Sequence, residues 1–271
     1  MLHLCQKADQ SLREEREEEE YKMKINLLEK KEERISFVIR DIPLWFANAI
    51  RRSVSEIPVL AIDTVEFYKN DSALYDEILA HRLGLIPLKA TSYLAERDKC
   101  SCKGAGCSKC TVKIKLKAKG PCTVYASELK GKGFEVIYKD MPIVILEKDQ
   151  ELEAVCEARL GKATEHAKFS PGLIWYNSFP LIKEVRKAEK TIKVDKEEFE
   201  KIREGKSKLI PDLLNETVEC NGKFLKIEPS EKDFIFFVES FGQFTPKEMF
   251  ILAIKALQQN LHELEKFLRK A

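Results

Sequence analysis

Two segments near the start of the chain alternate apolar and polar residues. The apolar positions are Ile25 and Leu27 in the first segment and Ile35, Phe37 and Ile39 in the second. Between them lie four charged residues, 30–33, which suit an exposed turn. A period of two on both sides of a polar turn is typical of a β-hairpin. The pattern therefore predicts a hairpin over residues 23–42.

The spacing becomes helical after this hairpin. The recurring apolar positions are Trp45, Phe46, Ala49, Ile50 and Ile57. Asp41 is of a residue type that caps helix N-termini, and Pro43 fits a first helical turn. Pro58 ends the pattern, because proline cannot continue a helix. We expect a helix between Pro43 and Pro58.

Residues 59–165 are predicted to be rich in β-strands. In the clearest strand, residues 111–119, four apolar positions alternate with four lysines, so that all four lysines share one face. That face is either a basic ribbon that contacts phosphates or an acidic partner, or a solvated face in which lysine guards the sheet. The second interpretation is favoured, because no aromatic residues lie between the lysines to stack on bases. Residues 134–138 and 143–146 indicate further short strands.

The composition changes in residues 178–222. Residues 183–208 are dense in charge and poor in large apolar side chains, with a short helical stretch near 196–203. This composition indicates a small inserted unit rather than part of the core. Residues 224–227 and 234–240 then predict a last pair of strands.

The helix at the end of the sequence has the most complete set of signals. Thr245, Pro246 and Glu248 form a capping box with proline at the first helical position. The stripe that follows consists of Met249, Leu252, Ala253, Ala256, Leu257, Leu261, Leu264 and Leu268. About 24 residues at 1.5 Å each give a helix roughly 36 Å long. Such a helix packs on its own sheet or on an equivalent helix of a partner, and its length favours the partner.

Residues 1–22 differ from the rest of the chain. Residues 13–20 are a block of charge, mostly glutamate, with almost no apolar partner. A segment of this kind is a solvated helix or a disordered tail. Met23 opens the patterned part of the sequence, and we expect it to be the functional start.

Composition narrows the class of protein. The 271 residues contain 47 Lys+Arg and 45 Asp+Glu, a net charge of +2. This balance argues against nucleic-acid binding through bulk charge, and the abundance of Lys, Arg and Glu is that of a heat-adapted protein. No apolar run approaches the roughly 20 residues that span a bilayer, and the first residues lack a signal-peptide pattern. We expect a cytoplasmic protein that is neither secreted nor inserted in a membrane.

Four of the eight cysteines form a dense cluster. Cys100, Cys102, Cys107 and Cys110 fit the pattern C-x-C-x4-C-x2-C, and glycines at 104 and 106 let the loop fold back. Four thiolates in a tetrahedron are a preferred ligand set for structural Zn²⁺. Because the protein fills all four positions, such a zinc ion has no open site for catalysis. Disulfides and an iron–sulfur cluster are the alternatives.

Catalytic motifs are absent from the sequence. None of the four histidines lies in an H-E-x-x-H motif, and neither G-x-S-x-G nor a P-loop occurs. His81 has no nucleophile near it in the sequence and is interpreted as a structural histidine. The residues alone therefore favour a binding or scaffold protein.

Four segments together resemble a known family. They are residues 46–52, 57–63, 76–88 and 165–171. On these segments the chain resembles the alpha family of multisubunit RNA polymerases, and in particular its archaeal branch, the D-type subunits. That branch is related to bacterial alpha and to the third-largest subunit of eukaryotic polymerase II. The resemblance covers residue 23 to the C-terminus.

The resemblance implies an α+β fold built from several parts. Residues 23–58 and 223–271 would form a discontinuous dimerisation domain, a sheet with two helices. Residues 59–177 would be an inserted β-rich domain that carries the cysteine loop 100–110, and residues 178–222 a small second insert. Residues 1–22 would be a disordered or helical extension.

The resemblance also implies partners. It implies a heterodimer with the small subunit L, subunits N and P nearby, and assembly with the second-largest subunit. The residues expected at these interfaces are Asn48, Arg51, Arg52, His81, Arg82, Leu252, Leu257, Leu261, Leu264 and Leu268. Arginine suits such interfaces because its guanidinium binds carboxylates in a bidentate manner. Arg51 and Arg52 bracing their own domain is the alternative.

Two cysteine-containing features of the family bear on cofactors. The cluster at Cys100–Cys110 resembles the zinc loop of the eukaryotic relative, with one extra residue between its middle cysteines. Some archaeal relatives carry a ferredoxin-like insert with an iron–sulfur cluster at the position of residues 178–222. Here Cys220 lies inside the insert and Cys156 upstream, and two thiols cannot supply the ligands. We expect structural zinc and no iron–sulfur cluster.

The resemblance implies a non-catalytic assembly subunit of DNA-directed RNA polymerase. Nucleotidyl transfer and contacts with DNA and RNA would then belong to the whole complex. A free-standing, zinc-containing nucleic-acid-binding protein that uses the lysine strand is the competing hypothesis, and it requires salt-sensitive binding by the isolated chain. No residue set in the sequence supports an enzyme acting by itself.

Overall fold

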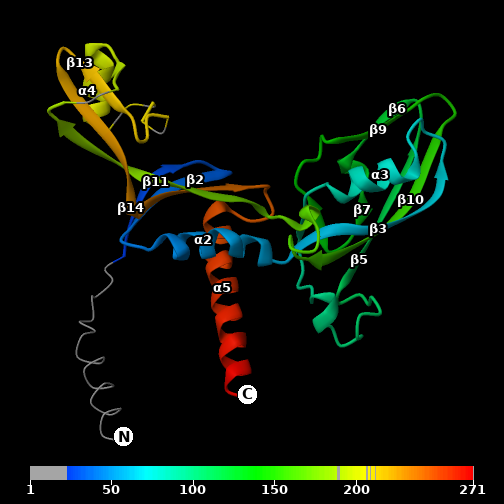
Figure 1. Ribbon diagram of the computed structural model, residues 1–271. Coiled ribbons are helices and arrows are strands. Elements are labelled where there is room, and N and C mark those ends of the chain that lie inside the picture. Colours follow the sequence, from blue (N-terminus) through cyan, green and yellow to red (C-terminus); the bar gives the residue numbers. More distant parts are fainter. Residues whose placement is uncertain (1–22, 188–189, 206, 208, 211, 271) are drawn as a thin grey trace, which may run out of the picture. The chain divides into compact units, whose positions relative to one another are not determined.

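Figure 1 shows the computed structural model, which describes residues 23–187, 190–205, 207, 209–210 and 212–270. The expected extension, residues 1–22, lies outside the described residues. The chain divides into two compact units, each built from three segments. The first unit consists of Met1–Asn26, Val38–Pro43 and Ser178–Phe234, and the second of Leu27–Phe37, Leu44–Asn177 and Ile235–Ala271. The chain has a mixed α+β fold with four α-helices and several sheets in the described residues.

The largest sheet contains the predicted hairpin. Its strand order is β1 (Lys24–Lys30), β2 (Arg34–Arg40), β14 (Lys223–Ser240), β13 (Thr217–Cys220) and β12 (Ile192–Lys193), and β11 (Gly172–Val185) also pairs with β14. The hairpin of β1 and β2 is therefore confirmed. The predicted pair of late strands is wrong, because both segments belong to the single strand β14. The polar residues between them break the apolar alternation but leave the backbone extended.

Strand β2 is covered on both faces rather than one. All five of its central residues are buried, including Ser36 and Val38, although the alternation predicted that only Ile35, Phe37 and Ile39 would be. At one end of the strand, the Arg34 guanidinium lies over the rings of Trp175 and Phe237, at 5.4 and 5.6 Å from their centroids. A guanidinium over aromatic rings is a cation–π contact, and here it covers the sheet surface at this end of β2.

The predicted first helix is α2 (Leu44–Ser53), followed by a short 3-10 helix, η1 (Val54–Glu56). Pro58 lies beyond its end, as predicted, but Asp41 is not the N-cap. Asp41 has a positive φ of 59° and its backbone N–H donates to Asp233 Oδ1 at 3.1 Å. A contact with a residue far along the chain therefore replaces the local cap.

Helix α5 (Pro246–Leu268) starts with the predicted capping box. The Thr245 hydroxyl accepts from the Glu248 N–H at 3.3 Å, and Glu248 accepts from the Thr245 N–H at 3.0 Å. The hydrogen bond from the Thr245 backbone is the largest cause that lowers the pKa of Glu248. Only Pro246, Met249, Phe250 and Ala253 of α5 are buried, so the helix is anchored by its first turns.

Three phenylalanines join α5 to the sheet of the second unit. Phe37 on β2 and Phe236 on β14 stack with ring centroids 5.9 Å apart. Phe250 on α5 meets both rings edge-on, at 4.9 and 5.8 Å. Edge-to-face contacts of this kind add to the stabilisation from burial alone. Figure 1 shows α2 and α5 on the same face of this part of the sheet.

The β-rich region is confirmed between residues 59 and 161. Its main sheet has the order β3 (Val59–Asn70), β10 (Glu151–Gly161), β5 (Thr111–Lys119) and β7 (Lys130–Gly131). Two smaller sheets pair β4 (Leu88–Ala90) with β8 (Phe134–Val136), and β6 (Cys122–Tyr125) with β9 (Pro142–Leu146). Helix α3 (Asp76–Gly84) and the 3-10 helices η2 (Arg97–Lys99), η3 (Ala126–Glu128) and η4 (Ala167–Phe169) complete the region.

The lysine strand has the bounds that the alternation predicted. In β5 the apolar side chains Val112, Ile114 and Leu116 are buried and the lysines are exposed. The neighbouring strand β10 supplies a carboxylate to three of the lysines. The pairs are Lys113–Glu157 at 3.7 Å, Lys117–Glu153 at 3.0 Å and Lys119–Glu151 at 3.0 Å. The lysine face is therefore exposed and carries ion pairs with the neighbouring strand, which supports the favoured interpretation of a solvated face.

The segment 178–222 packs around a small core that is separate from the core of the β-rich region, as expected for a small inserted unit. Helix α4 (Lys196–Arg203) has the predicted bounds, and Asp195 caps it by accepting from the Glu198 N–H at 2.7 Å. The core residues are Phe199, Ile202, Ile210, Leu213, Val218, Leu225 and Ile227. Two of these lie on β14, so the segment completes its core with the strand that follows it.

No helix in the described part of the chain is long and apolar enough to cross a membrane.

Replacing Phe236 with alanine is expected to lower the free energy of unfolding by about 3 to 5 kcal/mol, because the ring is fully buried between Phe37 and Phe250. Urea unfolding of the full chain measures this. The control is Phe267→Ala near the end of α5, where the ring is 71% exposed, and its effect should stay within about 0.5 kcal/mol. Equal effects of the two substitutions would contradict the anchoring of α5 by its first turns.

Candidate metal centre and docking surfaces

The four clustered cysteines lie on a loop that begins at η2 and ends at β5. Backbone hydrogen bonds fold the loop into two tight turns. In the first turn the Lys103 N–H donates to the Cys100 carbonyl at 3.0 Å. In the second, the N–H groups of Cys110 and Thr111 donate to the Cys107 carbonyl at 3.0 and 2.9 Å. Each turn therefore presents its pair of thiols to the same space.

The four sulfur atoms lie within 4.8 Å of one another. Cys100 Sγ is 3.6 Å from Cys107 Sγ, Cys102 Sγ is 3.6 Å from Cys110 Sγ, and Cys107 Sγ is 4.0 Å from Cys110 Sγ. A disulfide has a sulfur–sulfur distance of about 2.05 Å, so these thiols are not paired. A tetrahedral ion with metal–sulfur bonds of about 2.3 Å has edges of about 3.8 Å. The arrangement fits one metal ion at the centre of the four sulfurs.

Two features hold the loop in this shape. Gly106 has a positive φ of 84°, and a side chain there would lie 2.7 Å from the Arg97 guanidinium. Arg97 itself donates from Nε to the Gly104 carbonyl at 3.1 Å and so ties η2 to the loop. Glycine at position 106 therefore serves both the turn and the close approach of Arg97.

The electrostatics of the loop favour a thiolate at Cys102. Burial opposes its ionisation, but hydrogen bonds from the Cys100 thiol and from the backbone N–H groups of Gly106 and Cys107 outweigh it. Together they lower the pKa of Cys102 to about 6. The pKa of Cys156, which is buried alone among apolar side chains, rises to about 12. Metals bind thiolates, so Cys102 is suited to a metal and Cys156 is not.

The expected interface residues on α2 lie in different surroundings. The Arg51 guanidinium donates to Asn48 Oδ1 through Nε at 3.2 Å and through a terminal nitrogen at 2.9 Å. Arg51 thus braces its own helix in the described structure. Arg52 is exposed.

The expected interface residues on α3 are both exposed. Arg82 donates to the backbone carbonyls of Ile143 and Pro142, both at 2.8 Å, and so ties α3 to strand β9. His81, on the same turn, faces solvent. The structure therefore assigns Arg82 a contact within the β-rich region.

The leucines expected on α5 divide into two groups. Leu252 and Leu257 are half-buried. Leu261, Leu264 and Leu268 are 59%, 55% and 64% exposed, and Phe267 is 71% exposed. A monomeric protein rarely exposes a run of large apolar side chains on one helix.

Sequence reasoning missed a partly buried network around Asp63. Asp63 accepts from Arg159 Nε at 2.7 Å and from Lys168 Nζ at 2.8 Å. Arg159 also contacts Glu165 at 3.0 Å. Partial burial opposes ionisation of Asp63, but the hydrogen bonds from Arg159 and Lys168 outweigh it and lower its pKa. Asp63, Glu165 and Lys168 all lie in segments that carried the family resemblance, but their spacing gave no sign that they meet.

A second missed feature is the exposed apolar edge of the hairpin. Every residue of β1 is exposed, including Ile25, Leu27 and Leu28 at 56% to 61%. Trp45 at the start of α2 is 72% exposed. The alternation of β1 predicted a buried face, and the only sign of exposure was its position at the start of the hairpin.

Comparison with known proteins places the chain in a family. The family model described as the RNA polymerase Rpb3/RpoA insert domain matches residues 60–177. The Rpo3 subunit of the DNA-directed RNA polymerase of Pyrococcus horikoshii is 35% identical over 249 residues, which cover 88% of this chain and 94% of that protein. Its counterpart from Pyrococcus furiosus is 35% identical over 263 residues, 90% and 98% of the two chains. The chain belongs to the Rpo3 family of archaeal RNA polymerase subunits.

A third relative matches a shorter stretch at higher identity. The Rpo3 subunit of Methanothermobacter thermautotrophicus is 42% identical over 156 residues, 55% of this chain and 59% of that protein. Members of this family are components of a multisubunit nucleotidyltransferase. Membership implies that partner subunits exist, which agrees with the exposed apolar residues of β1, α2 and α5.

Replacing Cys110 with serine is expected to abolish binding of one metal ion per chain, because the buried Cys110 thiol supplies one corner of the tetrahedron. Elemental mass spectrometry of the purified full chain measures the metal content. Cys122→Ser, at an exposed cysteine outside the cluster, is the matched control and should retain the metal. Full metal content in both variants would refute metal binding by the four clustered cysteines.

Replacing Asp63 with asparagine is expected to lower the free energy of unfolding by about 1 to 2 kcal/mol at pH 7, since Arg159 and Lys168 lose a charged partner in a partly exposed site. The pKa of Asp63 is lower in the folded state than in the unfolded state. Its stabilising effect is therefore complete above the unfolded pKa, about 3.9, and is lost as the pH falls through the folded pKa.

Urea unfolding of Asp63→Asn and of the parent chain, followed from pH 7 to pH 3, tests this dependence. The difference between the two should shrink as the pH falls below about 4. A difference that stays constant over the whole range would show that charge at Asp63 plays no part.

Proposed function

We propose that this chain is a non-catalytic assembly subunit of the archaeal polymerase, corresponding to its D-type subunit. In this proposal it forms a heterodimer with the small subunit L and nucleates assembly with the second-largest subunit, with subunits N and P docking nearby. It is related to bacterial alpha and to the third-largest subunit of eukaryotic polymerase II. Contacts with DNA and RNA, and nucleotidyl transfer, belong to the whole complex in the cytoplasm.

The observation that carries this proposal is the division of α5. The first turns are buried against Phe37 and Phe236, and the remaining turns expose Leu261, Leu264, Phe267 and Leu268. Each large apolar side chain that moves from water into an interface contributes about 1.5 to 3 kcal/mol. The small subunit is proposed to cover this stripe together with the apolar side chains of β1.

The proposal divides the chain by role. Residues 23–58 and 223–271 form the dimerisation domain, residues 59–177 the inserted β-rich domain, and residues 178–222 a small second insert without an iron–sulfur cluster. The residues proposed at the interface with the larger partners are Asn48, Arg51, Arg52, His81 and Arg82. Within the chain, Arg51 also donates to Asn48, and Arg82 to the backbone of β9. The metal at Cys100–Cys110 is proposed to be structural zinc that fixes the loop.

The competing hypothesis of a nucleic-acid-binding protein relied on the positive charge of the lysine face of β5. Three lysines of β5 pair with carboxylates of β10, which neutralises most of the positive charge of that face. Affinity for phosphates needs unpaired cations. The assembly role is therefore the better supported function.

Replacing Leu264 with lysine is expected to abolish heterodimer formation, because a charge would be buried in the apolar interface. Tagged full chain is co-expressed with the small subunit, purified, and the stoichiometry is read by mass spectrometry. Tyr93→Lys, where a 91% exposed side chain lies on a loop of the β-rich region, is the control and should leave the heterodimer intact. Equal recovery of the small subunit with both variants would refute the role of α5.

A further inference from the structure

A pocket of about 340 Å³ lies within the first unit, where the second insert meets the start of β14. It is bordered by the end of β11, by helix α4 and by the turn that joins β13 to β14. None of the residues expected at polymerase interfaces lines it. The proposed function therefore leaves this pocket without a role.

The floor of the pocket is apolar. Phe199 on α4 and Leu225 on β14 line it and belong to the small core of the insert, where they are 3% and 1% exposed. Val185 and Phe224 line it as well and are only half-buried. The pocket therefore offers apolar surface to an incoming side chain.

The rim of the pocket carries an excess of positive charge. Its charged residues are Arg186, Arg203, Lys223 and Glu184. Arg203 pairs with Glu184 at 3.3 Å and with Glu200 on its own helix at 3.6 Å. Arg186 and Lys223 are exposed and have no carboxylate partner in the described part of the chain. Two cations of the rim are thus left to bind an anion.

The turn between β13 and β14 fixes one of these cations. Cys220 pairs with Lys223 across the turn, which leaves Asn221 and Gly222 as its two central residues. Both have a positive φ, of 50° and 74°. Asn-Gly with positive φ at both positions is typical of the tightest β-hairpin turn. Lys223 is therefore held at the edge of the pocket by a rigid connection.

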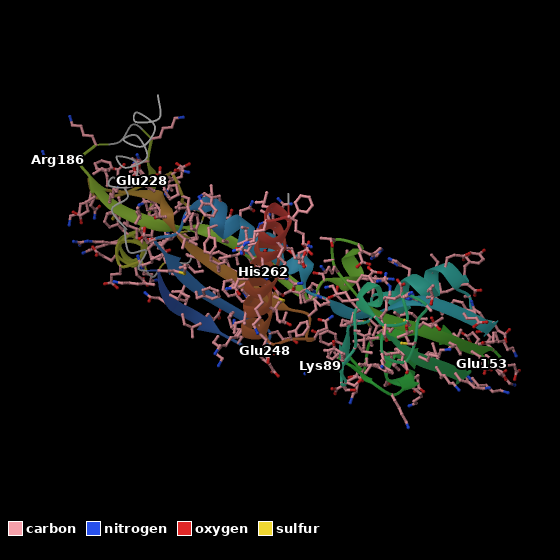
Figure 2. The ribbon with its side chains drawn as sticks, turned by 90° about the horizontal axis from the view of Figure 1, so that it is seen from below. Lys89, Glu153, Arg186, Glu228, Glu248 and His262 are labelled. Atoms are coloured by element: carbon pink, nitrogen blue, oxygen red, sulfur yellow. The ribbon has the colours of Figure 1, made fainter. Side chains whose placement is uncertain are left out.

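A carboxylate on the same strand does not balance this charge. Figure 2 labels it, Glu228 on β14, together with Arg186 after the end of β11. Glu228 already contacts two lysines, Lys183 at 2.6 Å and Lys226 at 2.8 Å. The hydrogen bond from Lys183 is the largest cause that lowers the pKa of Glu228, to about 2. An anion for Arg186 and Lys223 has to come from another segment.

The chain contains an acidic segment that none of the functions described so far uses. Residues 13–20 contain six glutamates and two arginines, and Leu12 precedes them. This segment lies outside the described residues and is joined to β1, which starts at Lys24. Its charge is opposite to that of the pocket rim, and its apolar neighbour suits the pocket floor.

The start of β1 lies within reach of the pocket. Because β1 and β2 form a hairpin, Lys24 lies beside the end of β2, and just beyond that end the Ile42 N–H donates to the Lys232 carbonyl at 2.9 Å. Strand β14 covers at most about 30 Å between Lys232 and Lys223, and β1 lies two strands, about 10 Å, to the side. The chain from Leu12 to Lys24 spans up to about 40 Å when extended.

We propose that the pocket binds the chain's own acidic segment. Leu12 contacts the apolar floor, and Glu14 and Glu15 pair with Arg186 and Lys223. Exposed ion pairs are individually weak, but a tethered segment has an effective concentration in the millimolar range. The docked segment neutralises the pocket and excludes other acidic peptides from it. The contacts of the proposed function begin at residue 23, so the inference does not depend on them.

The first experiment is carbodiimide crosslinking of the purified full chain, which joins a lysine amine to a carboxylate in direct contact. The expected product, mapped by mass spectrometry after digestion, joins Lys223 to Glu14 or Glu15. The pair Lys183 and Glu228 is the internal reference. The reference product without a product from Lys223 to the acidic segment would overturn the inference.

Isotope labelling separates the chain's own segment from that of a second copy. Equal amounts of ¹⁵N-labelled and unlabelled full chain are mixed before crosslinking. Each product should carry a single label, because the segment folds back on its own chain. Products in which Lys223 carries one label and the acidic segment the other would assign the pocket to a second copy and contradict the proposal.

Charge reversal tests the role of the rim. Arg186→Glu should lower the yield of the Lys223 product at least fivefold, because the new carboxylate repels the glutamates. Lys193→Glu, at an exposed lysine of β12 outside the pocket lining, makes the same change in net charge and should retain the product. An unchanged reference product shows that the insert is folded in both variants. Equal losses in the two variants would show that overall charge, not the pocket, is responsible.

A peptide supplied separately tests the pocket without the tether. A fluorescein-labelled peptide of residues 10–22 should bind a chain that starts at Met23, which keeps every described residue, and binding should weaken as salt is added. The full chain should bind it at least tenfold more weakly, because its own segment fills the pocket. A Leu12→Ser peptide should also bind more weakly to the Met23 chain. Equal binding of the original peptide by both chains, read by fluorescence anisotropy, would refute the proposal.

The native subunit provides the last check. Its intact mass, measured in polymerase purified from the native host, should include the acidic segment. A native chain that begins at Met23 would overturn the inference, because it has nothing to place in the pocket.

Discussion

The burial of Phe236 between Phe37 and Phe250 is the contact that fixes α5 to the hairpin and to strand β14. These three rings come from the hairpin, from the long strand β14 and from α5, segments separated by most of the chain. Because only the first turns of α5 take part, the rest of the helix projects with its leucines exposed. The same contact thus fixes the fold and creates the surface that a partner is proposed to cover.

In the β-rich region, ion pairs occur both on an exposed sheet face and in a partly buried network. On the exposed face of β5 and β10 they are solvated, and such pairs contribute little to stability. Around Asp63 they are partly buried and join β3, β10 and the loop containing η4. The network holds this loop against the sheet by charge-assisted hydrogen bonds, which are stronger than neutral ones. Pairing of this kind lets a chain with 34% charged residues place charges of both signs on one sheet without strong repulsion.

The cysteine loop gathers negative charge that only a bound cation can balance. Four thiols within 4.8 Å of one another need a cation to balance their charge once they ionise. Glu96, Asp98 and Lys99 lie just before Cys100 and also line a cavity beside α5. A metal that fixes the loop would therefore also fix one wall of that cavity.

The sequence by itself determined the elements whose signals are local. The hairpin, the lysine strand, helix α4 and the capping box of α5 all have the predicted positions, because spacing and capping act over a few residues. The cysteine motif predicted its own ligand set for the same reason. Only the tertiary structure decided that the Asp41 backbone donates to Asp233 and that Asp41 does not cap the helix. It also decided that β14 is one strand and that β2 is covered on both faces. It decided as well that Asp63 meets Arg159 and Lys168. Those contacts join residues far apart in the chain, and no periodicity within a segment records which distant segment will pack against it.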